Sequence, residues 1–228
     1  MCSLTRKLLV GSRFNGYIPV FAMSMMESNI SKQLICPIKN TQNVVTAPRS
    51  SIASPEGAKK AIFAAGCFWS VEKYFRDEFT DKGLYDIRVG YIGGHTSNPT
   101  YATVCTGRTG FAEAILISFD PNILKYVQLV ELFYAIHNPT KKNEQGFDIG
   151  TQYRSAIFYY DKEQEETARD VTERANRQWW SDEIVTEILP AGEWWDAEDY
   201  HQQYFVKNPD TKYQCTSHYY RYRNSKLK

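Results

Sequence analysis

The stretch that decides the fold is residues 61–79, which read AIFAAGCFWSVEKYFRDEF. Its first five residues are uniformly apolar and predict a short buried strand from Ala61 to Ala65. Gly66 permits a tight turn, and the apolar spacing then changes to the helical repeat of Val71, Tyr74, Phe75 and Phe79. A strand that passes through one glycine into a helix from Cys67 to Phe79 indicates a mixed α and β domain.

The same alternation continues to the C-terminus without an internal repeat. Further strands are predicted at Ile87–Tyr91, Glu113–Phe119, Ser155–Tyr160 and Ile184–Leu189. Further helices are predicted at Tyr126–His137, Glu163–Arg177 and Ala197–Phe205. One compact domain is therefore expected over residues 59–228, with a mobile C-terminal tail.

The N-terminal part differs in charge from this domain. Residues 1–60 hold eight Lys or Arg against Glu27 and Glu56, a balance of +6, whereas the remainder carries −5. We interpret residues 1–58 as an extension outside the fold. Its first 26 residues are basic and contain no acid, which is typical of a mitochondrial presequence, and a plain disordered tail is the equal alternative. The protein is thus expected in the cytoplasm and, through this extension, also in mitochondria.

Composition excludes several classes of protein. The formal net charge of +1 disfavours nucleic acid as a partner, and no stretch approaches the length of a membrane-spanning helix. Five cysteines without close pairing argue against a secreted disulfide framework and for reduced thiols. We expect a monomer.

Cys67 is the first candidate for chemistry. Backbone N–H groups and the helix dipole at the start of a helix stabilise a thiolate, which makes a cysteine nucleophilic near neutral pH. A small buried apolar residue, the usual fate of a cysteine, is an equally weighted alternative. Phe68 and Trp69, directly after it, fit either the core or the wall of an apolar pocket.

At this point the sequence resembles a known family through seven segments in order. They are GCFW (66–69), GYIGG (90–94), NPTY (98–101), AEA (112–114), HNPT (137–140), GTQYRS (150–155) and YHQQY (200–204). Together they resemble type A peptide methionine sulfoxide reductases, and Phe111 and the run CTSHY (215–219) are similar to the fungal and other eukaryotic members. Membership implies an α/β roll, a two-layer plait around a mixed sheet flanked by helices. It also implies reduction of methionine S-sulfoxide, free or in proteins, without metal or organic cofactor and with thioredoxin as reductant.

The resemblance also assigns roles, residue by residue. It implies that Cys67 is the nucleophile and that Phe68 and Trp69 bind the substrate methyl group. Glu113 falls on the family's acid, and its apolar surroundings, residues 111–117, would favour the protonated form of the carboxyl group. Without the resemblance, Glu113 fits an outward polar position on a strand equally well.

Three further residues receive roles in the same way. Tyr101 and Tyr153 fall on hydroxyl donors to the sulfoxide oxygen, although ordinary core tyrosines would otherwise be favoured. Asp148 falls on a carboxylate that helps to bind substrate, although an aspartate before a glycine more often serves a turn.

The thiol that resolves the resulting sulfenic acid is predicted to be Cys215. It follows Asn208-Pro209-Asp210 in a polar tail and matches the family's recycling cysteine. Cys105 is the competitor, interpreted as a packed structural thiol. Cys2 and Cys36 lie in the extension and are poor candidates.

Three other classes of protein remain as alternatives. A cysteine hydrolase would use Cys67 with His137 or His201 as base and Asn138 as orienting amide. A metal-binding module would start from Cys215 and His218, which form only half a site. A thioredoxin-like oxidoreductase is disfavoured because the chain has no Cys-x-x-Cys.

Overall fold

The computed structural model describes residues 49–181, 183–211, 217–222 and 227–228. The chain divides into two units, Met1–Thr41 and Gln42–Lys228, and all of the described residues belong to the second unit. The predicted presequence lies outside the described residues, as do Cys2, Cys36 and Cys215. The predicted domain boundary after residue 58 therefore stays a prediction.

Six strands form one sheet in the order β7-β6-β1-β3-β2-β8. Their bounds are β1 Lys59–Ala65, β2 Leu84–Ile92, β3 Ala112–Phe119, β6 Ser155–Tyr159, β7 Glu187–Pro190 and β8 Trp194–Asp196. In this sheet β6 and β7 run parallel, and the other neighbouring strands are antiparallel. The predicted mixed sheet flanked by helices is confirmed.

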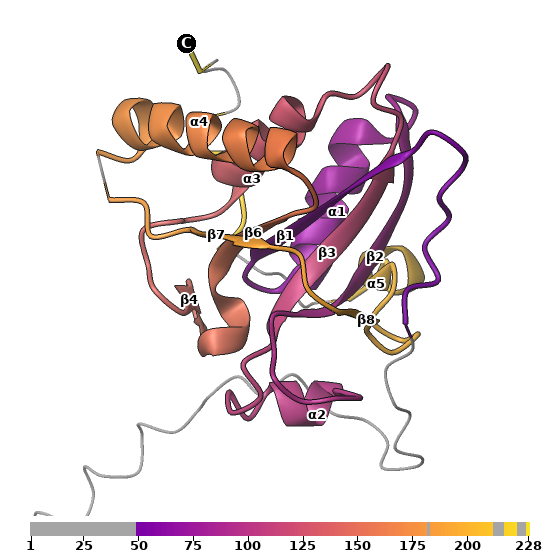
Figure 1. Ribbon diagram of the computed structural model, residues 1–228. Coiled ribbons are helices and arrows are strands. Elements are labelled where there is room, and N and C mark those ends of the chain that lie inside the picture. Colours follow the sequence, from indigo (N-terminus) through magenta and orange to yellow (C-terminus); the bar gives the residue numbers. More distant parts are fainter. Residues whose placement is uncertain (1–48, 182, 212–216, 223–226) are drawn as a thin grey trace, which may run out of the picture. The chain divides into compact units, whose positions relative to one another are not determined.

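The three longer helices pack against this sheet and have the bounds α1 Phe68–Phe79, α3 Tyr126–Ile136 and α4 Lys162–Trp179 (Figure 1). The short helices are α2 Tyr101–Val104, which lies beyond the end of the sheet, and α5 Tyr204–Lys207, which contacts α1 (Figure 1). Phe63 of β1 is completely buried, and its ring centroid lies 5.5 Å from those of Phe75 in α1 and Phe133 in α3. An aromatic layer therefore joins the central strand to two helices. None of the helices in the described ranges is long and apolar enough to span a bilayer.

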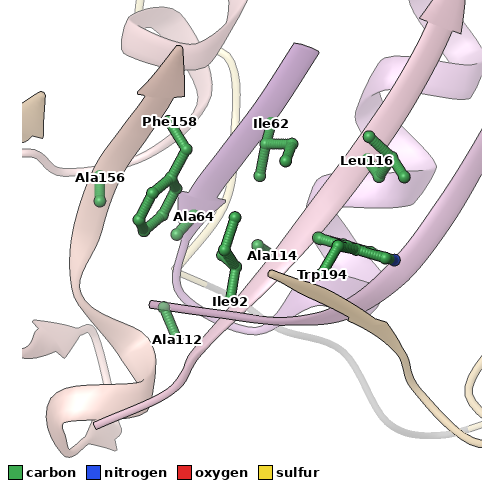
Figure 2. Close-up of a cluster of buried hydrophobic side chains, with 9 residues drawn as sticks. All are labelled: Ile62, Ala64, Ile92, Ala112, Ala114, Leu116, Ala156, Phe158 and Trp194. Carbon is green, nitrogen blue, oxygen red and sulfur yellow. The ribbon is translucent and has the colours of Figure 1, made fainter. Parts of the chain in front are cut away.

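The opposite face carries a cluster of smaller side chains. Ile62 and Ala64 of β1 lie in one cluster with Leu116 of β3 and Phe158 of β6, and Trp194 of β8 belongs to the same cluster on the side of β3 (Figure 2). Strand alternation explains this division, because Phe63 points to the helices and its neighbours Ile62 and Ala64 point away from them. Ile52, from the segment before β1, also packs against this cluster.

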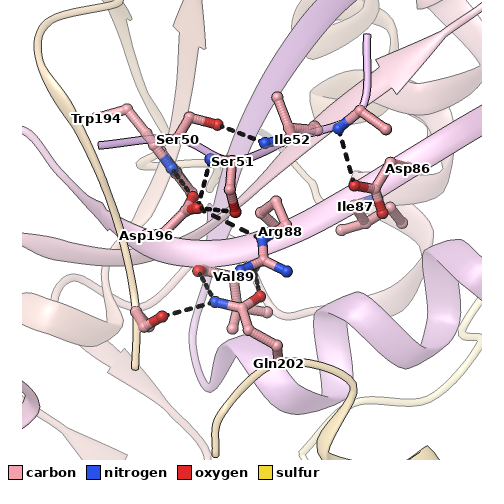
Figure 3. Close-up of polar contacts among 12 residues, drawn as sticks. Ser50, Ser51, Ile52, Asp86, Ile87, Arg88, Val89, Trp194, Asp196 and Gln202 are labelled. Atoms are coloured by element: carbon pink, nitrogen blue, oxygen red, sulfur yellow. Dashed lines mark hydrogen bonds and ion pairs between the residues drawn. The ribbon is translucent and has the colours of Figure 1, made fainter. Parts of the chain in front are cut away.

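Residues 49–53 are held to the edge of the sheet by one buried carboxylate. Asp196 is completely buried, and its Oδ2 accepts hydrogen bonds from Ser51 N at 2.7 Å and Ser51 Oγ at 2.8 Å (Figure 3). Its Oδ1 accepts a bond from Trp194 Nε1 at 2.7 Å, and Arg88 Nε lies 3.5 Å from Oδ2. Part of the predicted extension thus contacts the sheet.

Three elements near the C-terminus differ from the sequence prediction. Residues 197–203 are not helical, with turns over 199–203, and only α5 remains of the helix predicted over Ala197–Phe205. The cause is the side-chain amide of Gln202. Its oxygen accepts a hydrogen bond from Val89 N, and its nitrogen donates one to Val89 O (Figure 3). These two bonds continue the hydrogen bonding of β2 beyond the end of β8. The strand predicted from Ile184 begins only at Glu187, and β8 was missed because three residues give no usable periodicity.

Candidate active site

Cys67 lies at the N-terminus of α1, as predicted. It is the N-cap residue, and its side chain is 5% exposed. The turn before it requires glycine, because Gly66 has φ 91° and a Cβ there would lie 2.6 Å from Cβ of Gln145. The dipole and the N–H groups at the first turn of α1 favour negative charge beside this sulfur. The local backbone therefore suits a nucleophilic thiol.

Glu113 lies directly beside this helix start. It sits in β3 opposite Tyr91 of β2, and it is 1% exposed. Its Oε2 accepts a hydrogen bond from the backbone N–H of Phe68 at 3.2 Å. Because Phe68 follows Cys67, this bond brings the predicted acid next to the predicted nucleophile. The alternative of an outward polar residue on β3 is wrong.

Tyr153 lies close to the same groups. It ends the short 3₁₀ helix η1, Thr151–Tyr153. Burial raises the pKa of its hydroxyl, and the negative charges of Glu113, Cys105, Asp148 and Cys67 raise this pKa further. The hydroxyl is therefore held in its protonated form, as a hydrogen-bond donor must be.

Tyr101 begins α2, and its placement depends on the C-terminal turns. Its side chain is 9% exposed, and its ring centroid lies 4.6 Å from that of His201. Thr100 caps α2 by accepting a hydrogen bond from Thr103 N. The structure thus brings Tyr101 to the segment that follows β8.

Phe68 and Trp69 are both buried, at 1% and 7% exposure. Trp69 stacks on Tyr204 with a centroid distance of 3.6 Å and an interplanar angle of 6°. Its Nε1–H donates to Nδ1 of His201 at 3.1 Å. Phe68 contacts the rings of Tyr91 and His201. The two side chains belong to one aromatic layer beside Cys67, consistent with an apolar wall.

A cavity of about 140 Å³ lies beside Trp69, one of the two residues of this wall. It is lined by Trp69, by α1 residues that include Glu72 and Arg76, and by Gln203, Phe205 and Val206 near α5. Burial raises the pKa of Glu72, and Arg76 opposes this shift. The cavity therefore contacts Trp69, and Cys67 is not among its lining residues.

Asp148 lies in the two-stranded hairpin of β4 Glu144–Gln145 and β5 Asp148–Ile149, where it pairs with Gln145. The side-chain Nε2 of Gln145 donates a hydrogen bond at 3.5 Å to Ala65 O, at the start of the turn that carries Cys67. The structure therefore connects the Asp148 hairpin to the turn at Cys67.

The C-terminal tail approaches the same turn. His218 Nε2 lies 2.6 Å from Ala65 O, and a Cβ on Gly146 would lie 2.4 Å from Cβ of Ser217. Cys215 itself lies outside the described residues, so its predicted role is not tested. Cys105, the C-cap residue of α2, is exposed. Its predicted packing as a structural thiol is wrong, because α2 leaves its C-terminal end at the surface.

Sequence reasoning gave no role to Glu198, although it is 7% exposed and lies among these residues. It accepts hydrogen bonds from Tyr91 Oη and from Tyr101 N, both at 2.8 Å. The sequence predicts a short helix over Ala197–Phe205, in which Glu198 has no distinct role. The place of Glu198 in the site becomes visible only from its hydrogen bonds to Tyr91 and Tyr101, which are distant in the sequence.

The histidines needed by a cysteine hydrolase have other partners. His137 uses Nδ1 with Phe133 O at 2.5 Å and Nε2 with Ser155 Oγ at 2.8 Å, and burial lowers its pKa to about 3. Burial also lowers the pKa of His201 to about 3, and its Nδ1 accepts from Trp69. The described part of the chain contains no group of three or more His, Cys, Asp or Glu that could hold a metal ion.

Comparison with known proteins agrees with this arrangement. The family model for peptide methionine sulfoxide reductase matches residues 59–227. A probable peptide methionine sulfoxide reductase of Schizosaccharomyces pombe is 50% identical over 164 residues, which are 71% of this chain and 96% of that protein. The MsrA protein of Methanothermobacter thermautotrophicus is also 50% identical, over 66% of this chain and 88% of its own.

Solved structures show the same fold. Reduced Mxr1 of Saccharomyces cerevisiae has a TM-score of 0.71 and 34% identity, covering 77% of this chain and 99% of its own. Methionine sulfoxide reductase A of Corynebacterium diphtheriae has a TM-score of 0.64 and 35% identity, covering 75% and 89%. Mxr1 has also been solved in complex with Trx2, where the likeness of 24% identity and TM-score 0.53 concerns the fold alone. With the model match across the whole described domain, the chain belongs to the peptide methionine sulfoxide reductase family.

Proposed function

We propose that this peptide methionine sulfoxide reductase reduces methionine S-sulfoxide, free or in proteins, through the thiol of Cys67. The observation that carries the proposal is the contact between Glu113 Oε2 and the N–H of Phe68, which holds a buried carboxyl group beside a buried thiol at the start of α1. A sulfoxide needs this pair, because attack on its sulfur drives charge onto its oxygen.

In the proposed first half-reaction, Cys67 acts as nucleophile and Glu113 as acid. The Cys67 thiolate attacks the sulfoxide sulfur, and Glu113 gives its proton to the oxygen while Tyr101 and Tyr153 donate hydrogen bonds to it. The oxygen passes to Cys67, methionine leaves, and Cys67 becomes sulfenic acid, so the sulfoxide is reduced by two electrons and Cys67 is oxidised by two. Phe68 and Trp69 receive the methyl group, and Asp148 binds the polar part of the substrate.

The proposed second half-reaction uses Cys215. Its thiol attacks the Cys67 sulfur, a disulfide forms, and the oxygen leaves as water. The positions of Ser217 and His218 beside the turn at Cys67 support this assignment. A thioredoxin dithiol then reduces the disulfide, as the complex of the yeast protein with Trx2 suggests. In the proposed cycle, all electrons come from thiols. The protein is proposed to act as a monomer without nucleic acid or membrane partners.

A turnover assay tests the activity. Methionine S-sulfoxide and R-sulfoxide are supplied separately with dithiothreitol or with thioredoxin, and methionine is measured. We expect methionine from the S epimer alone. Activity on only the R epimer, or hydrolysis of amides or esters without sulfoxide reduction, would contradict the proposal.

Two serine variants test the resolving thiol. Cys215→Ser should form about one equivalent of methionine and then stall with thioredoxin, leaving Cys67 as a trappable sulfenic acid. Cys105→Ser, the matched control, should recycle almost normally. Peptide mapping after substrate treatment separates the candidates, because a dominant Cys67–Cys105 disulfide would transfer the role to Cys105.

The location of the protein is also proposed, as cytoplasm with an additional mitochondrial fraction. Residues 1–58 fused to a fluorescent reporter should direct part of it to mitochondria, since this segment carries six basic residues and no acid before Glu27. A fusion in which Arg6, Lys7 and Arg13 are replaced by Gln should remain in the cytoplasm. An entirely cytoplasmic wild-type fusion would refute the mitochondrial part.

A further inference from the structure

Glu198 is a buried carboxylate that holds two parts of the site at once. It lies in the turn after β8, and only 7% of it is exposed. Oε2 accepts from the Tyr91 hydroxyl and Oε1 accepts from the backbone N–H of Tyr101, both at 2.8 Å. Removing a carboxylate from water is costly unless such donors satisfy it. Glu198 therefore fixes the first residue of α2, which carries the Tyr101 hydroxyl.

Glu198 also faces the histidine that contacts Trp69. The indole N–H of Trp69 can only donate, so Nδ1 of His201, at 3.1 Å, must accept. A neutral imidazole then carries its proton on Nε2, and burial, which lowers the pKa of His201 to about 3, agrees with a neutral ring. His201 Nε2 lies 3.8 Å from Glu198 Oε2 and makes no hydrogen bond with other described residues. The negative carboxylate favours the tautomer with its proton on this side.

We propose that Glu198 is a positioning residue for sulfoxide reduction. It anchors the start of α2 and so places the Tyr101 hydroxyl, and it selects the His201 tautomer that accepts from Trp69 and so fixes the indole plane. Glu198 acts through these residues and not on the substrate. The inference rests on the proposed roles of Tyr101 and Trp69.

Asp196 provides a matched control. It is also a buried carboxylate, two residues before Glu198, and it too accepts an indole N–H. However, the partners of Asp196 are Ser51, Trp194 and Arg88 (Figure 3). These contacts attach the segment around Ser51 to the sheet and involve none of the proposed site residues. A general loss of stability should follow from changes at either carboxylate. A specific loss at the site should follow only at Glu198.

Single-turnover kinetics test the proposal. Full-length Glu198→Ala should reduce methionine S-sulfoxide about 10- to 100-fold more slowly at saturating substrate, the usual loss when a residue that orients an active-site group is removed. Glu198→Gln should recover part of this loss, because its amide can still accept from Tyr101 N and donate to the Tyr91 oxygen. Asp196→Asn should keep rate and KM within about twofold.

The indole N–H resonances give a readout that stability alone would not move. Trp69→Phe identifies the Trp69 signal in protein labelled with ¹⁵N-tryptophan. Glu198→Gln, in which no cavity is made, should shift this signal, because an amide replaces the charge facing His201. Asp196→Asn should shift the Trp194 signal and leave that of Trp69 unchanged.

Two results would overturn the inference, and they differ in meaning. If Tyr101→Phe and Trp69→Ala impair reduction but both Glu198 variants have wild-type rates and an unmoved Trp69 signal, Glu198 has no positioning role and the proposed function stands. If Tyr101→Phe and Trp69→Ala themselves react at wild-type rates, the site roles fail and the inference fails with them.

Discussion

Two segments that meet at the candidate site are held in place in opposite ways. The turn at Gly66 and Cys67 joins β1 directly to α1, so regular backbone structure on both sides fixes it. Residues 197–203 have no regular structure and are fixed by side chains, chiefly Gln202 on Val89 and Glu198 on Tyr101. The reacting thiol thus depends on local chain geometry, whereas the groups around it depend on contacts between distant residues.

The strongest test of the first segment is Cys67→Ser. Methionine formation should be abolished even in a single turnover, because a hydroxyl of high pKa cannot replace a thiolate. Methionine is measured after mixing excess enzyme with substrate. The thermal midpoint should stay close to that of the wild type, so a folded variant that still forms methionine would remove Cys67 from the mechanism.

Glu113→Gln tests the partner of this segment on β3. The amide can still accept from Phe68 N but has no proton to transfer, so the chemical step should slow by about 10²- to 10⁴-fold. Single-turnover rates near neutral pH measure the effect, and Glu187→Gln on the exposed strand β7 is the control. A rate equal to that of the wild type would refute the role of Glu113 as acid.

Gln202→Ala tests the second segment. It would leave the buried Val89 N–H without its partner and should lower the free energy of unfolding by about 1–3 kcal/mol. Denaturant unfolding measures this loss, with Gln203→Ala as a neighbouring control that retains the backbone bond from Gln203 N to Glu72. Unchanged stability would mean that residues 197–203 are ordered by something other than the Gln202 amide.

Ser51→Ala gives the smallest expected effect and extends the comparison to the N-terminal contact. It removes the Oγ bond to Asp196 but keeps the backbone bond, so a loss of about 0.5–1.5 kcal/mol is expected. Ser50→Ala, whose Oγ accepts only an exposed bond from Ile52 N, should change stability less. Equal losses would show that the bond between Ser51 Oγ and Asp196 adds no more to stability than the exposed bond of Ser50.

Local signals in the sequence were sufficient for the strand and helix around the thiol. The change of apolar spacing at Gly66 predicts Cys67 at a helix start, and the apolar run after Glu113 predicts the strand that carries this residue, whereas the inward direction of its carboxyl group came only from the resemblance to a family. The helix is confirmed because α1 buries one face at the spacing of 3.6 residues, and both strands are confirmed because β1 and β3 are buried on both faces and therefore read as largely continuous apolar runs. The candidate roles of Tyr101, Tyr153 and Asp148 came from the resemblance to a family, since no local pattern marks them.

The C-terminal turns, in contrast, could be understood only from the folded chain. The sequence predicts a helix over 197–205, but the Gln202 amide accepts from the N–H of Val89, 113 residues earlier in the chain, and donates to the Val89 carbonyl oxygen. The same folding buries Glu198 against Tyr91 and Tyr101 and attaches Ser51 to Asp196. No local pattern encodes such bonds, because burying a polar side chain is unfavourable unless it is hydrogen-bonded, and only the folded chain brings the partner within reach.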